Sequence, residues 1–179
     1  MNITKENILI QLNKTKRPGM DKLISFLDNS DYFTAPASTK YHGSYKGGLA
    51  DHSWHVFELL KEKNERYKIG LAFDTIIICG LLHDVCKINH YVPYGANYKV
   101  NDISPTGGHG EKSVFILQRF IELSDEEVAM IRWHMGMFDP SVQVDYPHGF
   151  AFRAACKKWP GVPALISADY EATSFVEMD

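Results

Sequence analysis

The segment from Asp74 to Ile88, DTIIICGLLHDVCKI, constrains the fold most, because it places ionisable residues inside a run that is otherwise apolar. Its isoleucines and leucines leave almost no polar side, which is typical of a central helix surrounded by other helices. In a helix of about 3.6 residues per turn, His83, Asp84 and Lys87 would point to one side. Burying such groups is unfavourable unless they have partners or hold a metal. The segment therefore predicts a buried polar site in a helical protein.

Apolar residues recur at helical spacing on both sides of this segment, so we predict an all-α fold. A long loop is expected at 30–48, and a small β-hairpin at about 91–103, around Gly95 and Ala96, within a lid at 89–110. Ser124 and Glu127 form a capping-box pair at the start of a helix. Residues 140–147 are expected to form a loop. The other predicted helices cover residues 4–13, 20–27, 49–67, 111–123, 150–158 and 164–175.

The length of 179 residues and the 45% hydrophobic content predict one compact domain over 1–179, with packing helices in residues 1–30. A net charge of −3 offers no basic surface for a long nucleic acid duplex. Three cysteines indicate no disulfide framework, so we expect a reducing cytoplasm. No apolar run approaches the ~18 residues of a membrane span. The oligomeric state cannot be read from the sequence.

Polar residues recur on the predicted helices at helix-sized intervals of 31, 25, 25 and 35 residues: His52, His83 with Asp84, His109, His134 and Asp169. Their order resembles the HD superfamily of metal-dependent phosphohydrolases, a helical-bundle fold. The segments YHGSYKGGLADH and CGLLHDVCK look most like the HD half of bacterial 3'-5' exoribonucleases. The segments GHGEKS, IRWHMG and ISADYEA resemble two-metal HD hydrolases. The resemblance covers roughly residues 35–175.

This resemblance implies a centre of two divalent metal ions. Imidazole and carboxylate ligands suit Mn, Fe, Co, Ni or Zn better than Mg or Ca. Two such ions can share a hydroxide and stabilise both the attacking and the leaving oxygen of a phosphoryl transfer. Asp84 would bridge the ions. The other ligands implied are His52, His83 and Asp169 for the first ion and His109 and His134 for the second.

Residues beside these ligands would meet the substrate. Lys87, the lysine of the family's HDxxK motif, would neutralise a phosphate oxygen, so it joins Asp84 as a catalytic candidate. His42 and Lys46 lie in the glycine-containing loop and are candidate substrate contacts, with ordinary loop residues as the alternative. Cys86 stands where many family members have glycine, and its side chain could narrow the site.

Alternative roles stay open for several of these residues. His109 and His134 could be helix caps or substrate contacts, and the central His-Asp pair could be a set of hydrogen-bonded core groups. His55, one turn beyond His52, is expected to support a ligand more than to bind a metal.

The resemblance predicts a divalent-metal phosphohydrolase or phosphodiesterase that acts on a nucleotide or short oligonucleotide. A processive nuclease is disfavoured, because the roughly 30 preceding residues cannot form the oligonucleotide-binding barrel of the exoribonucleases. One alternative is an HD-type di-iron oxygenase on a small substrate, which phosphate release under nitrogen would exclude. Another is a non-catalytic nucleotide-binding HD module, against which the full ligand set argues.

Overall fold

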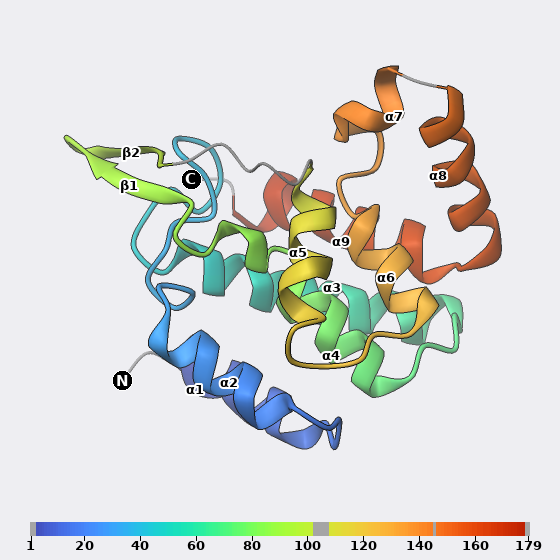
Figure 1. Ribbon diagram of the computed structural model, residues 1–179, viewed down its shortest axis with the longest axis horizontal. Helices are drawn as coiled ribbons and strands as arrows, with labels where there is room; N and C mark the ends of the chain where they lie inside the picture. The colour runs from blue at the N-terminus through green and yellow to red at the C-terminus, as the bar shows by residue number, and fades with distance from the viewer. Residues whose placement is uncertain (1–2, 102–107, 145, 178–179) are drawn as a thin grey trace.

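The computed structural model describes residues 3–101, 108–144 and 146–177, and it is mostly helical, which confirms the predicted all-α fold (Figure 1). No helix among these residues is both long and apolar enough to cross a membrane. The elements in order are α1 (Ile3–Lys14), α2 (Met20–Asn29), α3 (Gly48–Tyr67), α4 (Phe73–Leu82), the 3-10 helix η1 (Val85–Lys87), β1 (Tyr91–Tyr94), β2 (Asn97–Val100), α5 (His109–Leu117), α6 (Asp125–Arg132), the 3-10 helix η2 (Gly136–Phe138), α7 (Pro140–Val144), α8 (Tyr146–Lys158), α9 (Gly161–Glu171) and the π-helix η3 (Ala172–Val176).

Helices α3 and α4 lie side by side at the centre, with α1 and α2 along one side of them (Figure 1). Every residue of α4 from Thr75 to Leu82 is buried. Gly80 allows the close approach of the two helices, because a Cβ at this position would lie 2.6 Å from Cα of Phe57. This contact brings the N-terminal half of α3, which carries His52, next to the end of α4.

The predicted helix over 74–88 is wrong in its second half, because α4 ends at Leu82. Nδ1 of His83 donates to the carbonyl oxygen of Gly80 at 3.0 Å. In a continuing helix, that carbonyl would accept from the backbone of Asp84. The chain turns there, so Lys87 lies in η1 rather than on the helix. At its other end α4 begins at Phe73, so Asp74 lies in the first turn and does not cap the helix, although its position at the start of the apolar segment suggests a cap.

The predicted hairpin is confirmed. Strand β1 pairs antiparallel with β2, and Tyr94 faces Asn97 across the two-residue turn at Gly95 and Ala96. Gly95 has a φ of 62°, which a glycine adopts without steric cost. Residues 102 and 103 of the predicted hairpin, and 102–107 of the predicted lid, lie outside the described part of the chain.

Other helix boundaries differ from the predicted ones. The helix expected at 111–123 begins at His109 and ends at Leu117, and α6 ends at Arg132, so His134 follows that helix. The loop predicted at 140–147 is wrong, because residues Pro140–Val144 form α7. The Asp139 carboxylate accepts from the backbone of Ser141 at 2.8 Å and so satisfies a free donor in the first turn of α7.

Glu127 combines the predicted capping box with a tertiary contact. It accepts from the backbone of Ser124 at 2.9 Å, and Ser124 Oγ accepts from the backbone of Glu127 at 3.2 Å. The fully buried Glu127 carboxylate also accepts from Arg17 at 2.5 and 3.0 Å and from Thr75 at 3.0 Å. One carboxylate thus connects α6 with α4 and with the segment between α1 and α2.

Candidate metal centre

The structure brings five of the predicted site residues together around the carboxylate of Asp84. Its Oδ2 lies 3.8 Å from Nε2 of His52 and 3.6 Å from Nε2 of His83. Its Oδ1 lies 3.5 Å from Nε2 of His134. Asp169 on α9 joins them, because its Oδ1 is 3.2 Å from Nε2 of His52. Residues far apart in the sequence therefore meet at one buried point.

Two of these histidines are oriented by the same kind of hydrogen bond to a nearby backbone carbonyl. Nδ1 of His83 donates to the carbonyl of Gly80 at 3.0 Å, and Nδ1 of His134 donates to the carbonyl of Ile131 at 2.7 Å. Carbonyls in the last turn of a helix have no intrahelical partner, so each one is available. Because a carbonyl oxygen only accepts, each Nδ1 carries a proton and the lone pair of a neutral ring lies on Nε2. Both Nε2 atoms are buried without a hydrogen-bond partner.

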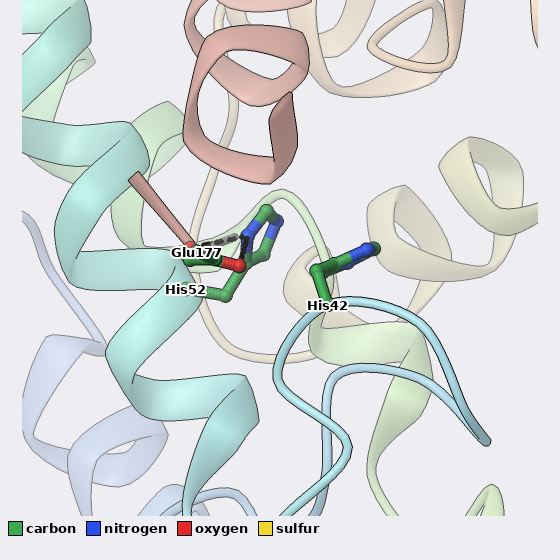
Figure 2. A group of neighbouring side chains, drawn as sticks. All are labelled: His42, His52 and Glu177. Atoms are coloured by element: carbon green, nitrogen blue, oxygen red, sulfur yellow. Dashed lines mark hydrogen bonds and ion pairs between the residues drawn. The ribbon is translucent and has the colours of Figure 1, made fainter. Parts of the chain in front are cut away.

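His52 is oriented by a carboxylate that the sequence analysis missed. Its Nδ1 lies 3.1 and 3.2 Å from the two carboxylate oxygens of Glu177, which reaches back to α3 from beyond the last helix (Figure 2). His55 donates to the same carboxylate at 2.9 Å. His52 and His55 therefore share the carboxylate of Glu177. No periodicity or motif marks Glu177 in the sequence.

The charge of Asp84 is balanced by Lys87. The ammonium lies 2.6 Å from Oδ2 of Asp84, and both side chains are buried. Burial raises the pKa of Asp84, but the charges of Lys87 and His83 outweigh it and hold this pKa well below its usual range. Burial lowers the pKa of Lys87, but the carboxylate of Asp84 outweighs it and raises this pKa. Asp84 is thus a carboxylate in contact with a buried ammonium.

The histidines differ in their protonation. Burial lowers the pKa of His83 to about 4, so His83 is neutral, which is the form that binds metals. Burial also lowers the pKa of His52, but hydrogen bonds with Asp169 and Glu177 outweigh it and raise this pKa to about 9. A divalent ion could take the place of the proton that His52 shares with Asp169.

These distances fit the ligand shell of a metal ion. Bonds of about 2.0 to 2.2 Å from a divalent ion to nitrogen and oxygen place neighbouring ligand atoms roughly 3.0 to 3.6 Å apart. The separations among Asp84, Asp169 and the three histidines run from 3.2 to 3.8 Å, so a bound ion would draw the most distant pair slightly closer. With the unpartnered Nε2 atoms of His83 and His134, these groups form a donor set suited to such an ion.

The remaining predicted residues lie at different distances from this centre. His109 at the start of α5 has its Nδ1 3.3 Å from Sγ of Cys86, within a group that also includes Asp84. His42 lies near His52, with ring centroids 4.9 Å apart and the rings tilted by 43°, and its Nε2 is buried without a partner (Figure 2). Lys46 is exposed, whereas Asp84 is buried.

The model of the HD domain family matches residues 49–165, a range that holds all the predicted histidine ligands together with Asp84 and ends just before Asp169. Neither the search of curated proteins nor the search of solved structures found a match. The closer resemblance to exoribonucleases stays a prediction.

Proposed function

The chain belongs to the HD domain family, a superfamily largely of metal-dependent hydrolases, and on that premise we propose that it is a divalent-metal phosphohydrolase or phosphodiesterase acting on a nucleotide or short oligonucleotide. One observation carries this proposal. Three buried imidazoles, those of His52, His83 and His134, direct Nε2 atoms to within 3.8 Å of a single carboxylate, and the Nε2 atoms of His83 and His134 have no hydrogen-bond partner. A buried polar atom without a partner is costly, and a metal ion would remove that cost.

The two oxygens of Asp84 divide the donors into two groups. Oδ2 faces His52 and His83, and Asp169 lies beside His52. Oδ1 faces His134. This arrangement supports a carboxylate that bridges two ions, with His109 as a further ligand on the Oδ1 side. Two bound divalent ions would supply an activated hydroxide and neutralise developing negative charge.

Lys87 would act on the substrate rather than hold the metals. An ammonium has no lone pair to donate to a cation. Its positive charge is buried beside the bridging carboxylate, where Coulomb interactions are stronger than in water. A phosphoester that approaches Asp84 would therefore meet a fixed positive charge, and the negative charge that grows during transfer would be stabilised.

The proposed substrate is small for an electrostatic reason. The net charge of −3 gives the protein no overall attraction for a long polyanion. Positive charge is instead concentrated at the site itself, in Lys87 and in the ions that the ligands would hold. A mononucleotide or short oligonucleotide would place one phosphate against these charges. His42, with its unpartnered Nε2, is the proposed hydrogen-bonding group beside it.

The experiment combines metal analysis with a screen of nucleotide phosphoesters. The Asp84→Ala variant should lose both bound metal and phosphate release while its helical circular dichroism is kept, because one carboxylate serves both ions. The control is Asp28→Ala, which removes an exposed carboxylate from α2. Activity of Asp84→Ala near that of the control would refute the metal mechanism. Assays under nitrogen with Zn or Mn decide against an oxygenase if phosphate release continues.

A further inference from the structure

Cys86 lies inside the candidate centre, although no cysteine belongs to the ligand set discussed so far. It is a free cysteine, 1% exposed, two residues after Asp84 in η1. Its Sγ lies 3.7 Å from Oδ1 of Asp84 and 3.3 Å from Nδ1 of His109. The ligating atoms of these three residues all lie within 4.8 Å of one another.

The sulfur faces the same carboxylate oxygen as an unpartnered imidazole. Nε2 of His134 lies 3.5 Å from Oδ1 of Asp84, is buried and has no hydrogen-bond partner. The side chain of His134 is 1% exposed, so bulk solvent does not reach this atom. Cys86 and His134 therefore approach Oδ1, whereas His52 and His83 approach Oδ2.

The distances match those between ligands of one ion. Bonds of about 2.0 to 2.1 Å to nitrogen or oxygen and about 2.3 Å to sulfur separate tetrahedral ligand atoms by roughly 3.3 to 3.7 Å. The separations from Oδ1 are 3.5 Å to His134 and 3.7 Å to Cys86, and sulfur lies 3.3 Å from His109. An ion bound by Asp84, Cys86 and His109 would need little movement of these three side chains, whereas His134 lies outside this group of described residues and would have to move closer.

We propose that Cys86 supplies a thiolate ligand to the metal ion on the Oδ1 side of Asp84, together with His134 and His109; this inference rests on the proposed two-metal centre. The divalent ion forms a bond to sulfur and the thiol loses its proton to solvent, so one proton is released for each sulfur bound. No electron transfer is involved.

A sulfur ligand would make the Oδ1 side of the centre bind some metal ions more tightly than others. Thiolates favour soft ions, so Zn, Fe and Co should bind there more tightly than Mn. The Oδ2 side offers only imidazoles and carboxylates and lacks this preference. The two positions should therefore fill in a different order with Co than with Mn.

Cobalt substitution tests the assignment directly, because a thiolate bound to Co(II) gives an intense charge-transfer absorption in the near ultraviolet. We expect this band in the wild-type protein loaded with two equivalents of Co(II), and its loss in Cys86→Ser. Cys79→Ser is the matched control, since Cys79 is also buried and lies on α4. It should keep the band. The affinity for one of the two Co(II) equivalents should fall at least about tenfold in Cys86→Ser only.

Several results would overturn the inference. A wild-type protein that binds two equivalents of Co(II) without the band, or that does not bind two, has no sulfur ligand of this kind. If Cys86→Ser binds one Co(II) equivalent more weakly but the wild-type protein shows no band, Cys86 is not a ligand and only positions His109. If Cys86→Ser does not fold, loss of the wild-type band in His134→Ala supports the assignment, and its persistence contradicts it.

The same samples separate this inference from the proposed function. A band without turnover of any nucleotide phosphoester would contradict the hydrolase proposal and leave the sulfur ligand in place. Turnover without a band would contradict the sulfur ligand alone.

Discussion

Glu177 is the most informative residue to change, because it orients His52 without touching the proposed metal ions. Its side chain is 6% exposed, and its carboxylate accepts from His52 and from His55. Hydrogen bonds of this kind hold a ligating imidazole in one tautomer and orientation, and their loss typically costs about 10- to 100-fold in metal affinity. We expect Glu177→Ala and Glu177→Gln to weaken metal binding by different amounts within that range.

The expected sizes follow from the contacts. Glu177→Ala leaves Nδ1 of His52 without its acceptor, so the loss should be near 100-fold, or about 2.7 kcal/mol. Glu177→Gln keeps a neutral acceptor, and a charge-assisted hydrogen bond is roughly twice as strong as a neutral one. About half of the free energy should therefore remain, and the loss should be near tenfold. Both variants should also lower the pKa of His52, which the carboxylate helps to raise to about 9.

The assay is competition for the metal with a chromophoric chelator, and the pKa of His52 is followed by NMR titration of the metal-free protein. Glu171→Gln is the control. It removes one negative charge from α9, but Glu171 pairs with Lys63 and Ser167 rather than with a histidine. If both Glu177 variants bind metal as tightly as Glu171→Gln does, Glu177 does not orient a ligand and the account of His52 is wrong.

Three other changes test separate parts of the structure. His134→Ala should remove one metal equivalent, and unchanged stoichiometry would indicate a mononuclear site. Lys87→Met should keep its metal but lose turnover by about 100-fold, as when one preorganised charge is removed; unaltered kcat and KM would show that Lys87 does not meet the substrate. Glu127→Ala should lower the free energy of unfolding by about 3 kcal/mol, because it leaves Arg17 without its buried partner, and denaturation at unchanged metal content checks this.

Periodicity alone was enough to predict most of the helices and the hairpin. Apolar spacing is a local property, and it places α3 within a residue of its predicted start. The turn at Gly95 and Ala96 is equally local, since a two-residue loop with glycine at positive φ defines the hairpin. The end of α4 was not predictable in this way, because a side chain at His83 competes for a backbone carbonyl that helical spacing assigns to the next turn.

The sequence by itself also determined which residue types could form the site. Histidines and aspartates at helix-sized intervals, together with one HDxxK motif, pointed to a set of candidate ligands before their positions were known. Their type and spacing follow from the chemistry of imidazole and carboxylate ligands on packed helices. Neither of these features depends on how the helices pack against one another.

Only the tertiary structure decided which groups contact one another. Glu177 and His52 are 125 residues apart, and no local pattern links them. In the sequence, Cys86 is only a departure from the family motif. In the structure, the turn after α4 places its sulfur beside His109. That turn likewise pairs Lys87 with Asp84. Local spacing describes one helix at a time, whereas these contacts depend on how close Gly80 allows α3 and α4 to lie and on the direction the chain takes after Leu82.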